Sequence, residues 1–165
     1  MSYAAELPVY QDIEYQPFSA QVRRVVDALD MLGQPLAPDA RMKIERALVA
    51  TDHAAAIKSL QEVLDRYCLA GVEINPESRV KATQGKAPPH LTQNGWTVFV
   101  LKVRNDAGIT AELAIQSPNA APVYARSTNV ADPKQTIDSK DIVQRWMDVA
   151  MFNDRPLNRG LSGLN

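Results

Sequence analysis

Residues 101–119 read LKVRNDAGITAELAIQSPN, and this stretch predicts a β-hairpin. The apolar residues from Trp96 to Val103 fall on both alternating faces, which is typical of a central strand covered on both sides. Residues 109–116 instead alternate apolar with polar, which is typical of a strand with one face in water. Between them, Asn105 and Gly108 tolerate the positive φ that a short turn requires. We therefore expect an antiparallel sheet built around the strand at 96–103.

The first 71 residues predict an extended arm followed by three helices. Residues 1–17 contain prolines and show no regular apolar period, so we expect them to lie across the body as an arm. Apolar residues then recur at helical spacing in three segments joined by short links, which favours a small antiparallel helical layer. These residues are Val22, Val25, Val26 and Leu29, then Met42, Ile44, Ala47 and Leu48, then Ile57, Leu60, Val63, Leu64 and Tyr67.

The ends of these helices are marked by residues with known preferences. Hydroxyl and carboxylate side chains cap helix N-termini, proline suits the first turn, and glycine follows the last turn. The expected caps or first residues are Ser19, Pro38, and Thr51 or Asp52, and the expected ends are Gly33 and Gly71.

The second half of the chain predicts strands and one further helix. Residues 72–82 alternate β-branched with polar residues, and residues 123–125 suit a brief strand. Asp138 can cap a helix over about 138–153. The predicted fold class is α+β, with a layer of about three helices packed with an antiparallel sheet or partial β-sandwich, plus the later helix. The predicted division is 1–71 for arm and helices and 72–165 for the β unit, unless the two form one continuous domain.

The composition shows no overall charge bias. The 165 residues carry 18 Lys and Arg against 19 Asp and Glu, a net charge of -1, so no global field attracts nucleic acid or an anionic membrane. Basic positions on the first two expected helices are interleaved with acids, which argues against a DNA-recognition helix. These positions are Arg23, Arg24, Arg41, Lys43 and Arg46. No run reaches the roughly 18 apolar residues of a membrane span, and the first residues do not resemble a secretion signal. We therefore expect no nucleic-acid partner and no membrane span.

No catalytic, cofactor-binding or metal-binding residue can be assigned from the sequence. Cys68 is the single cysteine, which excludes an intrachain disulfide and a multi-cysteine zinc site and favours apolar packing. His53 and His90 are far apart, and neither belongs to a metal-binding motif. Acidic residues such as Glu62 and Asp65 lie at helical spacing opposite the apolar stripes, which indicates solvated faces. Motifs for nucleotide binding and acyl transfer do not occur.

Trp96, Tyr124 and Arg126 are the candidates for a ligand-binding surface. An exposed aromatic ring can stack on the apolar face of a sugar, so a carbohydrate or another polymer is one possible partner. The alternative is that both rings pack in the core or at a sheet edge, and this alternative is favoured. The ligand of this surface is unknown.

Two stretches carry a family resemblance. They are NGWTVFVLKVRNDAGITAELAIQSPNA at 94–120 and RWMDVAMFNDRPLNRGLSGLN at 145–165. Together they resemble the region ahead of the catalytic domain in CehA/McbA-type metallohydrolases of the PHP superfamily. The matching features are the pattern Lys102-Val103-x-Asn105-x-Ala107-Gly108-x-Thr110, the exit Ser117-Pro118-Asn119, and the tail segments at 155–158 and 161–164.

The resemblance implies a noncatalytic accessory module of a larger bacterial metal-dependent hydrolase. The family's metal-binding histidine and acid motifs do not occur in these residues, so no catalytic residue is carried over. The implied partners are downstream domains of the same polypeptide, because the tail would continue into a further strand. Family members are often exported, which implies the periplasm or the exterior. A carbohydrate- or polymer-binding module and a small stand-alone enzyme, with a pocket formed by residues distant in sequence, stay open as alternatives.

Overall fold

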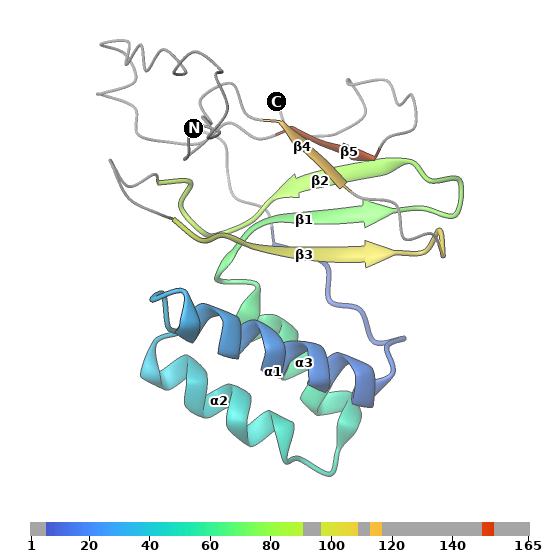
Figure 1. The fold of residues 1–165 in the computed structure, drawn as a ribbon. Coiled ribbons are helices and arrows are strands. Elements are labelled where there is room, and N and C mark those ends of the chain that lie inside the picture. Colours follow the sequence, from blue (N-terminus) through green and yellow to red (C-terminus); the bar gives the residue numbers. More distant parts are fainter. Residues whose placement is uncertain (1–5, 91–96, 109–112, 117–149, 154–165) are drawn as a thin grey trace, which may run out of the picture. The chain divides into compact units, whose positions relative to one another are not determined.

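The computed structural model describes residues 6–90, 97–108, 113–116 and 150–153. The described residues form helices and strands in an α+β arrangement, so the predicted fold class is confirmed (Figure 1). The elements are α1 (Tyr15–Met31), α2 (Pro38–Leu48), α3 (His53–Leu64), β1 (Cys68–Ile74), β2 (Val80–Gln84), β3 (Val100–Asn105), β4 (Leu113–Gln116) and β5 (Ala150–Asn153).

The chain divides into two compact units. The first contains Met1–Gly71, Thr83–Ala87 and Val98–Lys102, and the second contains Val72–Ala82, Pro88–Thr97 and Val103–Asn165. All three helices therefore belong to the first unit, whereas β4 and β5 belong to the second.

The three helices share one apolar core. Helix α3 packs against both α1 and α2, and each helix buries one stripe of its surface. The predicted stripes of α1 and α3 are confirmed, but Met42 on α2 is 52% exposed, so its predicted inward position is wrong. Met42 lies two residues before the buried Ile44, which places it about 200° around the helix axis. The core residues are Val22, Val26, Leu29, Leu36, Ala40, Ile44, Ala47, Ala56, Leu60 and Val63.

Three of the predicted helix-end signals are confirmed. Gly33 follows α1 with a φ of 74°, a conformation that side chains with a Cβ rarely adopt. Pro38 is the first residue of α2. Asp52 caps α3, because its Oδ1 accepts a hydrogen bond from the Ala55 amide at 3.0 Å.

Two predicted helix ends are wrong. Helix α1 begins at Tyr15, so Ser19 lies inside the helix, where its Oγ donates to the Gln16 carbonyl oxygen at 2.9 Å. Helix α3 ends at Leu64, and Gly71 lies inside β1. The β1 sequence CLAGVEI is apolar on both faces, so a buried strand uses these residues better than one more helical turn would.

Strands β1, β2 and β3 form a mixed sheet in the order β2-β1-β3. Strand β1 runs antiparallel to β2 and parallel to β3, so the sheet is not wholly antiparallel as expected (Figure 1). Every β1 residue is buried except the half-buried Glu73, whereas the β3 residues are half-buried or exposed. The central strand among the described ones is therefore β1, and the prediction of a fully covered central strand at 96–103 is wrong.

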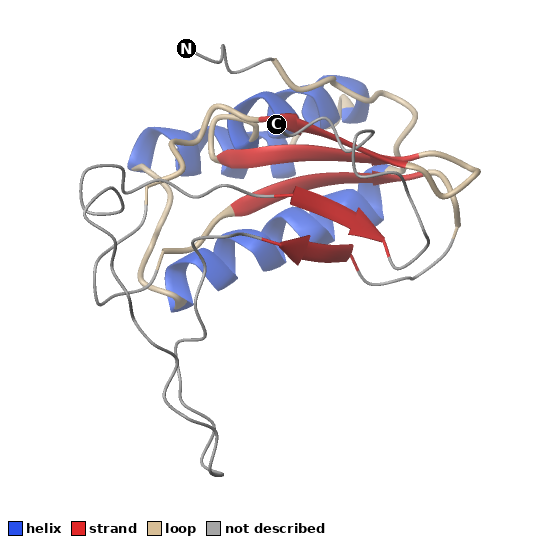
Figure 2. Ribbon diagram, turned by 90° about the horizontal axis from the view of Figure 1, so that it is seen from above, coloured by secondary structure: helices blue, strands red, loops and turns tan. Residues whose placement is uncertain are grey.

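The predicted hairpin between residues 101–105 and 109–116 is also wrong. Strand β4 pairs antiparallel with β5, with Leu113 opposite Asn153 and Gln116 opposite Ala150, and this pair forms its own two-stranded sheet (Figure 2). Gly108 has a positive φ of 64°, as the turn signal expects, but Asn105 is the last residue of β3 and does not have a positive φ. Strand β5 replaces the end of the helix predicted over 138–153. Residues 117–149, which include the predicted strand at 123–125, lie outside the described residues.

Candidate functional site

The N-terminal arm, residues 6–14, packs onto the first unit through Leu7. Leu7 is buried although it lies in a segment without helix or strand. A Cβ built at Gly71 would lie 2.7 Å from the Leu7 Cδ2 atom, closer than such atoms approach in proteins. The absence of a Cβ at Gly71 leaves the space that the Leu7 side chain fills. The arm expected over residues 1–17 is observed only over 6–14, because Tyr15–Pro17 belong to α1 and residues 1–5 lie outside the described residues.

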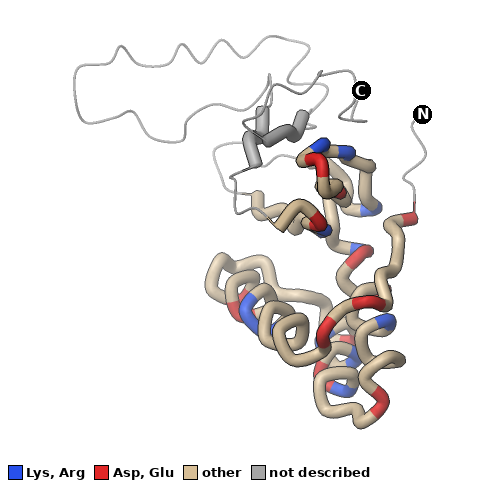
Figure 3. The backbone as a smooth tube through the Cα atoms, turned by 90° about the vertical axis from the view of Figure 1, so that its right-hand side faces the viewer, with Lys and Arg blue, Asp and Glu red and all other residues tan. Residues whose placement is uncertain are grey.

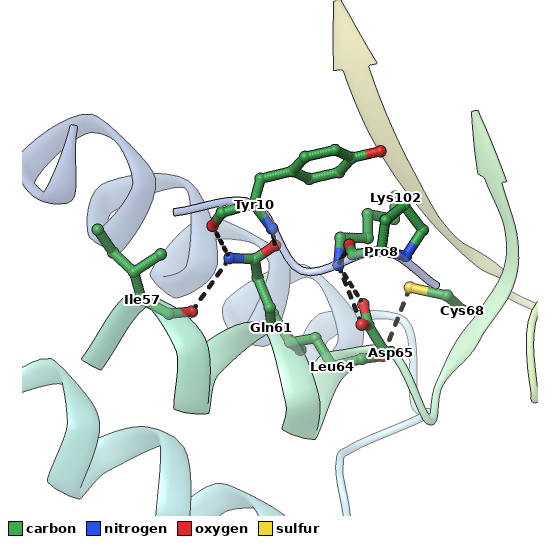
Figure 4. Close-up of polar contacts among 8 residues, drawn as sticks. All are labelled: Pro8, Tyr10, Ile57, Gln61, Leu64, Asp65, Cys68 and Lys102. Carbon is green, nitrogen blue, oxygen red and sulfur yellow. Dashed lines mark hydrogen bonds and ion pairs between the residues drawn. The ribbon is translucent and has the colours of Figure 1, made fainter. Parts of the chain in front are cut away.

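The side chain of Gln61 on α3 binds the main chain of the arm. The Tyr10 amide donates to Gln61 Oε1 at 3.0 Å, and Gln61 Nε2 donates to the Tyr10 carbonyl oxygen at 2.6 Å (Figure 4). The same Nε2 atom donates to the Ile57 carbonyl oxygen at 3.3 Å. With the arm in place Gln61 is only 2% exposed, and both polar atoms of its amide have hydrogen-bond partners, as buried polar groups need. The arm thus completes the hydrogen bonding of a side chain in the helical layer.

Asp65 and Lys102 form a partly buried ion pair next to the arm. Lys102 Nζ lies 2.9 Å from Asp65 Oδ1 and 3.0 Å from Oδ2, and each side chain is only 14% exposed. Lys102 Nζ also donates to the Pro8 carbonyl oxygen at 2.8 Å, and it lies 5.5 Å from the centre of the Tyr10 ring. The ammonium group therefore meets a carboxylate, a main-chain carbonyl and an aromatic face (Figure 4).

Burial dominates the electrostatics of this pair. The pKa of Asp65 is raised above its usual value, because burial penalises the carboxylate more than the hydrogen bond and charge of Lys102 favour it. A buried pair of this kind depends on both partners, since an unpaired charge in this position is strongly unfavourable. Lys102 of β3 therefore offsets part of the burial penalty on the Asp65 carboxylate, one residue beyond α3.

Cys68 lies beside this pair and is inert. The residue is buried, and its Sγ donates weakly to the Leu64 carbonyl oxygen at 3.4 Å. Burial, with a smaller contribution from the Asp65 charge, raises the pKa of Cys68 to about 12. The side chain therefore stays a neutral thiol near pH 7, and the predicted packing role of Cys68 is confirmed.

The two histidines do not come together. His53 is the first residue of α3 and stacks on Tyr15, with ring centroids 4.1 Å apart and planes 8° apart. The Tyr15 hydroxyl donates to the Leu48 carbonyl oxygen at 2.9 Å, so this stack joins the starts of α1 and α3 to the end of α2. His90 is exposed and lies outside the helices and strands, at an isolated β-bridge position. Within the described part of the chain, no three metal-ligating side chains lie close enough to hold a metal ion.

Basic and acidic residues are mixed along the helices (Figure 3). Lys43 lies 3.9 Å from Asp39 and Lys58 lies 3.8 Å from Glu62, each pair one turn apart on an exposed helix surface. Such pairs stabilise helices only slightly. The absence of a nucleic-acid partner stays a prediction. The described helices include none that is long and apolar enough to cross a bilayer.

The residues that build this site were missed by sequence reasoning, which placed Asp65 among the solvated acids. One available signal was the position of Asp65 four residues after Gln61, at the border of the apolar stripe of α3. Another was Lys102, a single cation within an apolar run. The proposed ligand-binding residues Trp96, Tyr124 and Arg126 lie outside the described residues.

Comparisons with protein-family models, curated proteins and solved structures found no match for this chain. The resemblance to the metallohydrolase region therefore stays a prediction from the sequence.

Proposed function

We propose that the chain is a noncatalytic accessory module of a larger metal-dependent hydrolase. The noncatalytic part rests on one observation: Asp65 and Lys102, the partly buried ion pair next to the arm, are already engaged in contacts within the chain. Both oxygens of Asp65 face Lys102 Nζ, and Lys102 also binds the Pro8 carbonyl oxygen. Lys102, paired with Asp65, therefore holds the chain's own arm at Pro8.

A catalytic role would require different properties from these residues. A general base needs a carboxylate within hydrogen-bond reach of a substrate proton, and a nucleophilic cysteine needs a lowered pKa. Asp65 is instead covered by Lys102, and the pKa of Cys68 is raised to about 12. The chemistry of this cluster favours a structural role.

The accessory part of the proposal rests on the sequence resemblance at 94–120 and 145–165. It implies that downstream domains of the same polypeptide are the partners, and that the parent protein is a bacterial hydrolase of the periplasm or exterior. The alternative, a carbohydrate- or polymer-binding module, rests on Trp96, Tyr124 and Arg126 and stays a prediction.

The proposal is tested by melting the chain with Zn²⁺, Mn²⁺ or EDTA and by assaying hydrolysis of p-nitrophenyl phosphate and p-nitrophenyl acetate with each metal. We expect no metal-dependent rise in melting temperature and no turnover above that of buffer. The matched control is Asp65→Asn, which removes the carboxylate of the cluster. Turnover that is present in the wild type and lost in Asp65→Asn would show that this cluster is catalytic.

A further inference from the structure

The groups that hold the N-terminal arm form a site in their own right, which we call the arm site: Gln61, Asp65, Gly71 and Lys102. These residues come from α3, the turn after it, β1 and β3, and all of them lie in the first unit. The arm contacts are distant in sequence, since Tyr10 and Gln61 are 51 positions apart and Pro8 and Lys102 are 94 apart. The arm is therefore held by residues far from it in the sequence.

The arm site contacts mainly the main chain of its occupant. Gln61 binds both the amide and the carbonyl of Tyr10, and Lys102 binds the carbonyl of Pro8. Leu7 contributes the apolar side chain, which fills the space over Gly71. Main-chain hydrogen bonds with a pocket for one side chain are a general way to bind an extended peptide segment. The arm of this chain, with the sequence ELPVY at residues 6–10, is such a segment.

We infer that the arm site also binds the N-terminal arm of a second copy of this chain, which gives an arm-exchanged dimer. A second copy carries the identical Leu7, Pro8 and Tyr10, so the exchanged arm can make every contact that the chain's own arm makes. The connection from the arm to α1 is surface-exposed at Gln11, Asp12 and Glu14. Exchange of an identical segment is a low-cost route to a dimer, because the contacts in the two states are the same.

The balance between the two states depends on the competition from the chain's own arm. A tethered arm has an effective concentration on the order of millimolar, so the wild-type chain is expected to be mainly monomeric in dilute solution. Weakening the arm of one copy and the arm site of another removes this competition. The remaining intact arm and intact site then lie on different molecules.

Two full-length variants test the inference. Leu7→Asp weakens the arm and leaves the site intact, and Gln61→Leu removes both hydrogen bonds to Tyr10 and leaves the arm intact. Sedimentation velocity is measured for each variant alone and for an equimolar mixture. We expect a heterodimer in the mixture, with a dissociation constant at least about tenfold lower than that of either variant alone. The matched control mixes Leu7→Asp with the double variant Leu7→Asp/Gln61→Leu, which supplies no intact arm and should give no heterodimer.

A mixture that stays monomeric while both variants retain their helical circular dichroism would overturn the inference. Equal heterodimer in the control mixture would also overturn it, because that association would not use the arm. A measurement on the unmodified sequence covers the case in which a variant fails to fold. Donor-labelled and acceptor-labelled wild-type chains are mixed at high concentration, and energy transfer that develops with time supports exchange. Energy transfer that stays absent at every concentration contradicts it.

Discussion

Replacing Lys102 by methionine should lower the free energy of unfolding by about 3 kcal/mol. The change keeps the apolar stem of the side chain and removes the ammonium group. Asp65 is only 14% exposed and would lose contacts of 2.9 and 3.0 Å, and the Pro8 carbonyl would lose its donor at 2.8 Å. Breaking a buried ion pair costs about 3–5 kcal/mol, and the residual exposure of both side chains places this pair at the lower end.

Urea unfolding followed by circular dichroism measures this change, and the melting temperature should fall by about 6–12 °C for a chain of this size. The matched control is Lys58→Met, which removes an exposed ammonium 3.8 Å from Glu62 and should cost at most about 0.5 kcal/mol. The double variant Asp65→Leu/Lys102→Met should recover part of the loss, because it leaves no unpaired charge. If Lys102→Met costs no more than Lys58→Met, the ion pair does not anchor the arm.

Three further predictions concern the same unit. Burial raises the pKa of Asp65 in the folded chain above its usual value of about 3.8. The wild type should therefore become more stable relative to Asp65→Asn as the pH falls from 7 through that raised pKa, and the full gain should be present below 3.8. Urea unfolding at pH 7 and pH 4 measures the difference between the two proteins, and an unchanged difference would contradict the assignment. The pKa of about 12 for Cys68, against an ordinary 9.0, predicts labelling by Ellman's reagent at pH 8 at least about 10³-fold slower than for the unfolded chain, and comparable rates would contradict its burial. In Gly85→Ala the new Cβ would overlap the main-chain carbonyl oxygen of Cys68, so the free energy of unfolding should fall by about 3 kcal/mol or more. In Gly33→Ala the new Cβ meets no neighbour, and the positive φ alone should lower the free energy of unfolding by about 1 kcal/mol. Equal thermal stability of these two glycine variants would show that the main chain at Gly85 is not closely packed.

The helical layer could be predicted because its signals are local. An apolar residue every three or four positions, a proline in a first turn and a carboxylate at Asp52 act within one or two turns of a helix. The sequence places the end of α3 too late, because strand β1 uses the residues that would continue the helix. Residues 68–74 are more stable as a strand buried on both faces than as a continuation of the helix. No local sequence pattern indicates this difference in stability.

Strand pairing and the arm site depend on contacts between distant residues. The positive φ of Gly108 could be predicted from its residue type, yet β3 lies beside β1, and β4 pairs with β5. Register and partner choice depend on which faces are buried in the whole fold, and a single sequence does not show this. Lys102 and Asp65 are likewise 37 positions apart, so their contact was not visible in any spacing. Their charges could only be interpreted separately, and a solvated face was then the expected environment for Asp65.

The most direct test of the account is hydrogen exchange at the Tyr10 amide, measured by NMR in the wild type and in Gln61→Leu. The account predicts a protected amide in the wild type, because Tyr10 N donates to Gln61 Oε1 at 3.0 Å. In Gln61→Leu the protection of this amide should be lost while the amides in the middle of α3 keep theirs. Exchange of the Tyr10 amide at the unfolded-chain rate in the wild type would contradict the claim that the described polar cluster exists to hold the arm.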